Sequence, residues 1–402
     1  MKVGIISNFP VGPRYNGGAM TVWGLYKAYK EKGLDTSLIL LCEENVDKKL
    51  FENCEEFLNL NNVKYEIIFF NVKKKTFFKK IKNLITSIIF KTPEYFFYEQ
   101  SNLNKKIKDI LDNKNFDKII CYHFDALSAC YLNNDKKIIC FMGDLIHEPR
   151  NASRKNFKKN SFVDLLNKLE TFISMRVMLN MLSNFKNIGF CANHYKTLIE
   201  NKLSNTSYFR VPLIKPNKII EYQSKNNNIN TILLIGDLTG TVTTSSLIYL
   251  KKFLDFTRKE IKQYFKFHII GGGQIRDELK NLKNFDCVEF KGVNHNVSNL
   301  FNKSSILLVS NEITVGIRVR IITAMSHGLV VLTHSSNLNG IPELEHNKNV
   351  LVFNTLKELE DLFFGIKEAK YNLNKISKEA LSTFNKFFYY KEAVEDLEKK
   401  II

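Results

Sequence analysis

Two arginines in one glycine-containing loop are the residues of this chain best suited to chemistry. Arg318 and Arg320 lie in SNEITVGIRVRIITAMSHG, residues 310–328, directly after an apolar run. Their guanidinium groups, together with the backbone amides of Gly316 and Ile317, predict a site for an anion such as the phosphate of a departing nucleotide. The alternative is that two arginines at this spacing flank a surface turn.

Glycines follow three other apolar, strand-like runs of the sequence. A glycine lets the backbone approach a base or a phosphate closely, and the N-terminus of a following helix attracts anions. The glycine spacing in the first of these loops differs from the dinucleotide fingerprint, so a nicotinamide cofactor is not expected. A flexible turn is the alternative. The candidates for donor binding are Gly17, Gly18, Gly236, Thr239, Gly271, Gly272 and Gly273.

Ionisable side chains follow two further apolar runs, in CYHFDALSACYL and CFMGDLIHEPR. Histidine and carboxylate groups at the end of a sheet bind sugar hydroxyls or move protons. Each of them alone can instead cap a strand end or a turn. Their grouping after neighbouring strands favours a functional role. They are His123, Asp125, Asp144 and His147, with Glu148 beside them.

Strands and helices must position these residues. Short apolar, strand-like runs alternate with helical patterns along the whole chain. This alternation predicts an α/β fold in which helices cover parallel sheets. Such sheets bind their ligands at the carboxyl ends of the strands. The expected strands are 2–7, 37–42, 65–70, 118–122, 137–141 and 187–191 in the first half, and 231–235, 266–270, 287–290, 306–309, 329–332 and 350–353 in the second.

A length of 402 residues and a polar, Asn-rich break before the second set of strands predict two domains. We expect an N-terminal domain over 1–214, a linker over 215–230 and a C-terminal domain over 231–383. Residues 384–402 are expected to form a C-terminal helix that packs back on the N-terminal domain. Both domains should be doubly wound and Rossmann-like, facing each other across a cleft.

The net charge of +18 calls for a polyanionic neighbour. Basic and apolar residues interleave over 73–90 and again over 154–181, as in helices that lie on an anionic lipid surface. A solvated face over an ordinary core is the alternative. No apolar run approaches the ~20 residues that span a bilayer. Since no nucleic-acid-reading module is recognisable, a nucleic-acid partner is not expected.

The seven cysteines are odd in number and lack the spacing of metal ligands, so we expect reduced core residues and no metal site. The apolar N-terminus soon reaches prolines and paired glycines, which suits a buried strand better than a signal peptide. The expected location is the cytoplasm, with peripheral attachment to the inner face of the cytoplasmic membrane.

Taken together, these loops resemble the group-1 glycosyltransferase family, in its retaining GT-B, family 4-like branch, over essentially the whole chain. The resemblance rests on the Gly-Gly loop after the first strand, Gly271–Gly273 after a later strand, FKGVNHNVSNLFNKSSILLVS and AMSHGLVVLT. The chain is most similar to members with a Gly-Ile-Arg-Val-Arg or Gly-Ile-Arg-Val-Lys loop. It departs from the family at Val315 and Thr323, where two glutamates are usual.

The resemblance implies that His123 contacts the transferred sugar, that Gly17 and Gly18 border the acceptor and the donor sugar, and that residues 316–323 with Gly272 hold the nucleotide. It also implies an acceptor-binding N-terminal domain over 1–214 and a nucleotide-sugar-binding C-terminal domain over 231–383. The nucleotide sugar is the implied co-substrate, with no further cofactor. We therefore expect sugar transfer to a glycan or lipid-linked acceptor in surface polysaccharide, lipopolysaccharide or capsule synthesis. His123, Arg318 and Arg320 are the expected catalytic residues, and Asp125, Asp144 and His147 lie on the acceptor side.

An alternative from another class remains. Because the glutamate pair is missing, the chain can also be a catalytically inactive subunit that keeps the fold and binds a glycan or a nucleotide.

Overall fold

The chain folds into two compact units, seen here in a computed structural model. The first unit comprises residues 1–217 and 389–402, and the second comprises residues 218–388. The structure describes residues 1–12, 17–43, 48–70, 101–130, 137–145, 148, 161–200, 202–203, 206–216, 229–294, 300–301 and 306–401. The basic segment at 73–90, the stretch from 154 to 160 and His147 therefore lie outside the described residues.

The first unit is built on a parallel sheet whose strands follow the order β3-β2-β1-β4-β5-β6-β7. The order reverses between β1 and β4, so the carboxyl ends of these two strands lie at a topological switch point, where sheets of this kind bind ligands. The strands are β1 (Lys2–Ser7), β2 (Asp35–Glu43), β3 (Tyr65–Phe70), β4 (Lys118–Tyr122), β5 (Ile138–Met142), β6 (Asn187–Phe190) and β7 (Ser207–Arg210).

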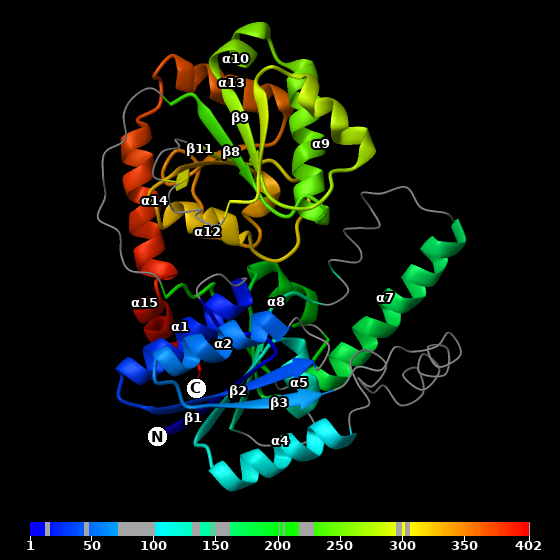
Figure 1. Cartoon of the computed structure of the whole chain (residues 1–402), viewed down its shortest axis with the longest axis vertical. Helices are drawn as coiled ribbons and strands as arrows, with labels where there is room; N and C mark the ends of the chain where they lie inside the picture. Colours follow the sequence, from blue (N-terminus) through cyan, green and yellow to red (C-terminus); the bar gives the residue numbers. More distant parts are fainter. Residues whose placement is uncertain are drawn as a thin grey trace. The chain divides into compact units, whose positions relative to one another are not determined.

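Helices cover both faces of this sheet. Figure 1 shows α1 and α2 on one side of β1, β2 and β3, and α4 on the other. The described helices of the unit are α1 (Gly17–Glu31), α2 (Lys48–Leu60), α4 (Ser101–Lys114), α5 (His123–Cys130), α7 (Ser161–Leu182), α8 (Asn193–Ile199) and α15 (Tyr390–Lys400).

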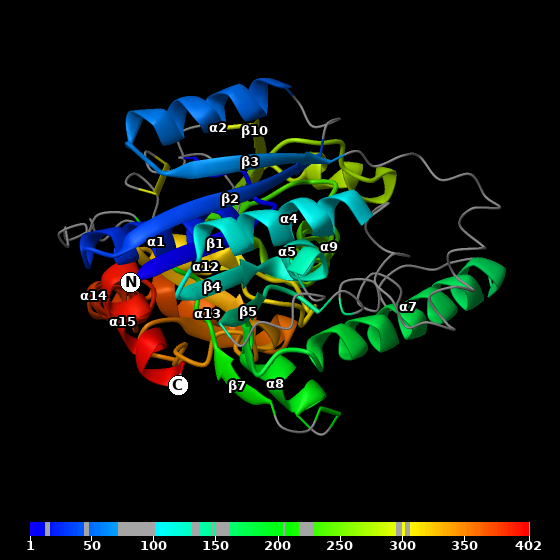
Figure 2. The same ribbon diagram turned by 90° about the horizontal axis from the view of Figure 1, so that it is seen from below.

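The last helix, α15, packs on α1. The Tyr390 hydroxyl donates to Glu31 Oε1 at 2.6 Å, and Lys118 Nζ donates to both oxygens of Glu398 at 2.9 Å. Tyr29 donates to the same Glu398 carboxylate from a fully buried position. Figure 2 shows α15 close to the N-terminus. The final residues are thus part of the first unit.

The second unit contains a parallel sheet in the order β10-β9-β8-β11-β12-β13. Its switch point lies between β8 and β11. Helices α9 and α13 pack together on one face, and α12 packs with α14 on the other. The strands are β8 (Thr231–Ile235), β9 (Lys266–Ile270), β10 (Val288–Gly292), β11 (Ile306–Val309), β12 (Val330–His334) and β13 (Leu351–Phe353). The helices are α9 (Thr241–Phe256), α10 (Lys259–Tyr264), α12 (Val319–Met325), α13 (Leu356–Lys367) and α14 (Leu373–Phe387), with 3₁₀ turns η3 (Asp277–Asn284) and η4 (Ser335–Asn337).

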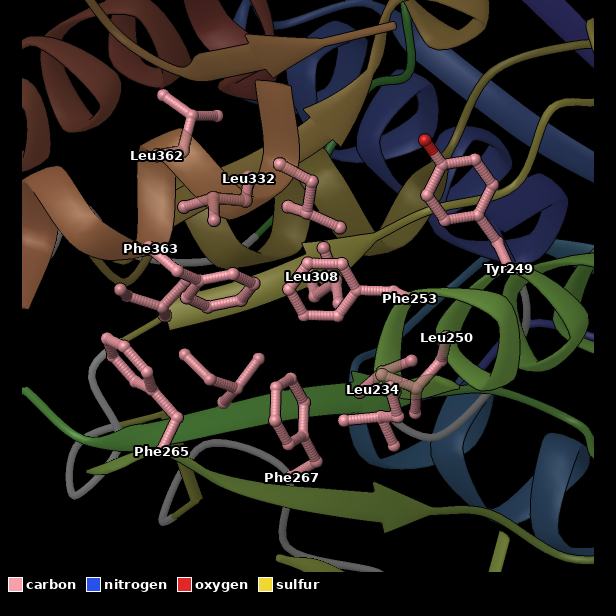
Figure 3. Packing of buried hydrophobic residues seen from close by; sticks show 14 of the residues in the cluster. Leu234, Tyr249, Leu250, Phe253, Phe265, Phe267, Leu308, Leu332, Leu362 and Phe363 are labelled. Atoms are coloured by element: carbon pink, nitrogen blue, oxygen red, sulfur yellow. The ribbon is translucent and has the colours of Figure 1, made fainter. Parts of the chain in front are cut away.

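Aromatic side chains hold α9 and α13 against this sheet. Figure 3 shows Phe363 of α13 among Phe253 of α9, Phe265 and Phe267, with Leu308 of β11 beside them. The ring of Phe363 lies 5.3, 4.8 and 5.8 Å, centroid to centroid, from those three phenylalanines. Ring pairs at such distances stabilise a core beyond the area that they bury.

The predicted α/β class with two parallel, doubly wound sheets is confirmed, and each predicted strand forms within a few residues of its expected bounds. Strand β7 was not expected. The helical pattern between Leu373 and Lys400 gives two helices, because Tyr389 leaves the helical conformation and pairs with Lys215 as a β-bridge. The segment after Gly271–Gly273 forms the 3₁₀ segment η3, which begins at Asp277.

None of the helices that the structure describes is both long and apolar enough to cross a membrane. All seven cysteines are free thiols, and six of them are buried. Cys191, in the loop after β6, is partly exposed.

Candidate functional site

The loops after β8, β9 and β10 of the second unit are joined by backbone hydrogen bonds. The Gly236 amide donates to the carbonyl oxygen of Ile270 at 3.0 Å, and the Leu238 amide donates to that of Gly272 at 2.9 Å. The Gly271 amide donates to Gly292 at 2.9 Å. A Cβ atom on Gly271 would overlap the carbonyl oxygen of Gly236. Gly271 therefore allows two loops to approach at the carboxyl edge of the sheet.

Gly272, Gly273 and Thr239 lie at the same edge. Gly273 has a φ of +94°, which favours glycine, and a Cβ there would lie 2.7 Å from Thr239 Cγ2. A Cβ atom on Gly272 would lie 2.9 Å from Val293 Cγ2. The amide and the hydroxyl of Thr239 donate to Asp237 Oδ1 at 3.0 and 2.8 Å, and these bonds hold the pKa of the Asp237 carboxyl below its usual range. The predicted donor-side residues of these loops thus share one edge of the sheet.

The loop that carries the arginines is fixed by Arg318. This side chain donates to the carbonyl oxygens of Ile313 and Val315 at 3.1 and 2.6 Å, and to Asn337 Oδ1 at 3.2 Å. Gly316 adopts a φ of +58°, and its carbonyl oxygen leaves no room for a Cβ on Gly340. Ile317 is partly exposed in this loop. In the structure, then, the Arg318 guanidinium binds its own loop and the neighbouring η4 turn.

Arg320 connects α12 to the end of β8. Its Nη1 atom donates to the Ile235 carbonyl oxygen at 2.6 Å, and its Nη2 atom lies 3.5 Å from Thr243 Oγ1. Burial, and then the charge of Arg318, lower the pKa of Arg320 to about 10, so the group remains a cation at neutral pH. An ideal Cβ on Gly236 would lie 3.2 Å from Arg320 Nη1. A partly buried positive charge therefore lies beside Gly236.

The N-terminus of α9 lies next to the same loop. Its N-cap is Gly240, and no side chain accepts a hydrogen bond at this cap. The first-turn amides of a 16-residue helix carry a partial positive charge that favours anions. Together with Arg320, they make this edge of the second sheet suited to a phosphate.

Thr323 occupies the first turns of α12, and its hydroxyl donates to the Val319 carbonyl oxygen at 2.9 Å. Its own carbonyl oxygen accepts from Ser326 Oγ at 2.7 Å. A threonine offers one hydroxyl where a carboxylate offers two acceptor oxygens. In this arrangement the hydroxyl stabilises the helix locally.

In the first unit, His123 follows β4 in a strained conformation. Its φ is +74°, a region that non-glycine residues rarely adopt, and such strain is common at functional sites. The imidazole packs against the Phe9 ring with a centroid distance of 5.1 Å, and a Cβ on Gly143 would lie 2.9 Å from His123 Cδ2. Burial lowers the pKa of His123, although the charge of Asp144 opposes this shift.

Asp125 is 9% exposed and lies in the first turn of α5. Its Oδ2 atom accepts a hydrogen bond from Asn8 Nδ2 and lies 3.9 Å from His123 Nδ1. Burial raises the pKa of the Asp125 carboxyl to about 6, even though the bond from Asn8 lowers it. Asn8 was missed in the sequence, where an asparagine directly after a strand resembles an ordinary turn residue.

Asp144, after β5, belongs to a neighbouring network. Its Oδ1 atom accepts from the Tyr195 hydroxyl at 3.1 Å and lies 3.7 Å from Cys191 Sγ. Burial and then Asp144 raise the pKa of the Cys191 thiol, so this cysteine stays protonated at neutral pH.

Gly17 and Gly18 begin α1 on the other side of Phe9. Thr21 Oγ1 donates to the Gly17 carbonyl oxygen at 3.0 Å, and a Cβ on Gly18 would lie 2.7 Å from the Phe9 ring. Phe9 therefore contacts both Gly18 and His123. In each unit, the predicted site residues that the structure describes thus lie at the carboxyl edge of that unit's own sheet.

Residues 230–366, which make up most of the second unit, match the family model of glycosyl transferases group 1. Over most of its length, the second unit is accordingly similar to group 1 glycosyl transferases. None of the curated protein sequences compared with the chain matches it.

Solved structures show that the whole chain has the GT-B fold. A glycosyltransferase from Rickettsia africae is 15% identical, with a TM-score of 0.63 over 99% of this chain and 98% of that one. Alr3699/HepE from Anabaena, solved in complex with UDP, is 13% identical, with a TM-score of 0.67 over the full length of both chains. WaaG, a glycosyltransferase of lipopolysaccharide biosynthesis, is 13% identical, with a TM-score of 0.61 over 99% of both chains.

Proposed function

We propose that this GT-B protein is an active glycosyltransferase that moves a sugar from a nucleotide-sugar donor to a glycan or lipid-linked acceptor in the synthesis of a surface polysaccharide, lipopolysaccharide or capsule. The observation that carries the proposal is the cationic, glycine-lined edge of the second sheet, within the segment that matches group 1 glycosyl transferases. The UDP complex of the Anabaena neighbour and the pathway of WaaG support a nucleotide donor and a surface-glycan acceptor.

In this proposal the second unit binds the nucleotide. The loops at Gly236, Gly271–Gly273 and Gly316 bring backbone close to the ligand, and the uncapped amides of α9 favour its phosphates. Arg318 and Arg320 balance the negative charge that develops on the leaving phosphate, so that the reaction depends on fixed cations rather than a metal ion. We propose retention of configuration, and no cofactor besides the nucleotide sugar.

We further propose that the first unit binds the sugar and the acceptor. His123 lies at the switch point of the sheet, next to Asp125 and within electrostatic range of Asp144. A partly buried, neutral imidazole can donate to or accept from a sugar hydroxyl without carrying a charge into the site.

A peripheral position on the inner face of the cytoplasmic membrane is part of the proposal. Leu169 and Phe172 of α7 are 43% and 51% exposed, and the Arg176 guanidinium lies 5.6 Å from the Phe172 ring centroid. Lys168, next to Leu169, is also exposed. Exposed apolar groups flanked by cations suit an anionic lipid surface.

A second candidate is a catalytically inactive subunit that binds a glycan or a nucleotide. It is favoured by Val315, which is buried, and by Thr323, whose hydroxyl is bonded within its own helix. Neither residue offers the carboxylate found in similar glycosyltransferases.

A binding screen followed by an assay separates the two candidates. Thermal melting of the full chain is measured with uridine, guanosine, adenosine and cytidine sugar nucleotides, because a ligand that binds the native state raises the melting temperature. Nucleotide release from the binding donor is then measured with membrane extracts as the acceptor source. A stabilising sugar nucleotide that is turned over supports the enzyme. Stabilisation without turnover, including hydrolysis, favours the inactive subunit.

A further inference from the structure

Three buried polar atoms without a hydrogen-bond partner lie on adjoining side chains of the first unit. They are Asn8 Oδ1, His123 Nδ1 and Asp125 Oδ1, and none has a partner among the described residues. The side chains adjoin because Asn8 Nδ2 donates to Asp125 Oδ2, while His123 Nδ1 lies 3.9 Å from that same oxygen. We call these three residues the Asn8 cluster.

Buried polar atoms without hydrogen-bond partners, grouped in this way, indicate a site that binds a ligand. Leaving a buried donor or acceptor unsatisfied is energetically costly, so native proteins rarely leave several together. The cluster is not an accident of loose packing, because Phe9 and Gly143 hold the imidazole while Asp125 is 9% exposed. It also lies after β1 and β4, at the switch point of the sheet, where ligands of such sheets bind.

The chemistry of these atoms restricts what can occupy the cluster. The amide oxygen of Asn8 only accepts, the free carboxylate oxygen of Asp125 only accepts, and the imidazole nitrogen can accept or donate. A group that satisfies them must therefore donate hydrogen bonds. A phosphate or a carboxylate offers only acceptors and would meet the charge of Asp125.

We propose that Asn8 and Asp125 form a specificity subsite, beside His123, that binds unmodified hydroxyl groups of a sugar ring and rejects an anionic substituent at that position. This proposal rests on the proposed sugar-transfer function and adds Asn8 and Asp125 to it as residues that select the sugar. An amide and a carboxyl group with buried polar atoms discriminate strongly between sugars, because a sugar that lacks the matching hydroxyl leaves these atoms unpaired.

The test uses saturation-transfer NMR of the full chain with a set of neutral monosaccharides as methyl glycosides, and with methyl glucuronide as the anionic probe. We expect at least one neutral sugar to bind and the glucuronide not to bind. Asp125→Asn and Asn8→Ala should each weaken neutral-sugar binding by roughly tenfold or more, as expected for losing a hydrogen bond to a charged or buried group. Asp109→Asn, an exposed carboxyl on α4 of the same unit, is the matched control and should change nothing.

Thermal melting with nucleotides is measured on the same variants, so that failure of the subsite is distinguished from failure of the proposed function. If nucleotide still binds but no neutral sugar does, or if both variants bind sugar like the parent chain, then water fills the Asn8 cluster and the subsite is wrong. Equal binding of the glucuronide also overturns it. If no nucleotide binds while the binding of neutral sugars depends on Asp125, the proposed subsite is supported and the proposed sugar-transfer function is wrong.

Because Asn is isosteric with Asp and carries no charge to bury, Asp125→Asn should fold. Thermal melting of each variant without ligand checks this.

Discussion

The Nη1 atom of Arg320 donates a hydrogen bond to the carbonyl oxygen of Ile235 at 2.6 Å. Ile235 is the last residue of β8, and Arg320 lies in the first turn of α12. The bond therefore links the two strand-end loops on either side of the switch point in the second sheet. It also places a partly buried cation beside Gly236, in a loop that has no basic residue of its own.

Substituting the two arginines should reveal which one acts on the leaving phosphate. We expect Arg318→Ala or Arg320→Ala to lower turnover by roughly a hundredfold or more at saturating donor, because a charged donor in a dry site contributes about 3 kcal/mol to the barrier. Arg320 is the stronger candidate, since Arg318 already donates to three acceptors in its own neighbourhood. Steady-state kinetics on folded variants measure the effect, with Arg276→Ala as the control. Near-normal turnover in both variants would place the phosphate elsewhere.

Asp125 should make the stability of the chain depend on pH. Its folded-state pKa of about 6 exceeds the ordinary 3.8, so the native state binds more protons than the unfolded state between these values. Its contribution to stability is therefore present in full below pH 4 and is lost as pH rises to about 6, by about 3 kcal/mol. In denaturant titrations, Asp125→Asn should remove this part of the pH dependence. A parallel pH profile for parent and variant would contradict the assignment.

Gly271 should tolerate no side chain. In Gly271→Ala the new methyl group meets the Gly236 carbonyl oxygen, so one of the two loops must shift. We expect a loss of stability of about 1–3 kcal/mol, as for other overpacked sites, together with weaker nucleotide binding. Gly33→Asn is the control, because Gly33 has a φ of +76° with open space around it, and asparagine tolerates this conformation. Chemical denaturation and melting shifts with nucleotide measure both effects.

The exposed apolar residues of α7 should mediate lipid binding if the membrane proposal is right. The parent chain should pellet with anionic vesicles, fail to pellet with neutral ones and be released by salt. Combining Leu169→Ser with Phe172→Ser should reduce this binding several-fold. Phe256→Ser, at a residue 50% exposed on α9, is the matched control. Vesicle binding that changes neither with the charge of the lipid nor with the α7 substitutions would contradict the proposal.

The strands could be predicted because each is an apolar run bounded by polar or glycine residues, and burial of both sheet faces requires such runs. Strand β7 escaped prediction because Ser207–Arg210 contains two polar residues in four and is followed closely by Pro212. Strand β7 lies at the edge of the sheet because it pairs with β6, and no local sequence pattern encodes this pairing.

The site could be predicted only as a set of residue types at strand ends. That Arg318 and Arg320 both donate to backbone carbonyls depends on loops brought together by the fold, from residues as distant in sequence as Ile235. Likewise, Gly271 was expected to make room for a ligand, whereas the group that it accommodates in the structure is the Gly236 carbonyl. The proposed role of Asn8 depends on its contact with Asp125, which only the folded chain brings about.

The return of α15 to α1 affects how the protein is made. Glu398 pairs with Lys118 and Tyr29, and Tyr390 pairs with Glu31, yet residues 218–388 are translated in between. Domains commonly fold in order as they leave the ribosome. Here the N-terminal unit must wait until Tyr390–Lys400 have been translated to acquire its last helix, while the second unit, which is continuous in sequence, is free to finish first. A nascent chain released before Tyr390 would carry a complete second unit attached to an unfinished first one.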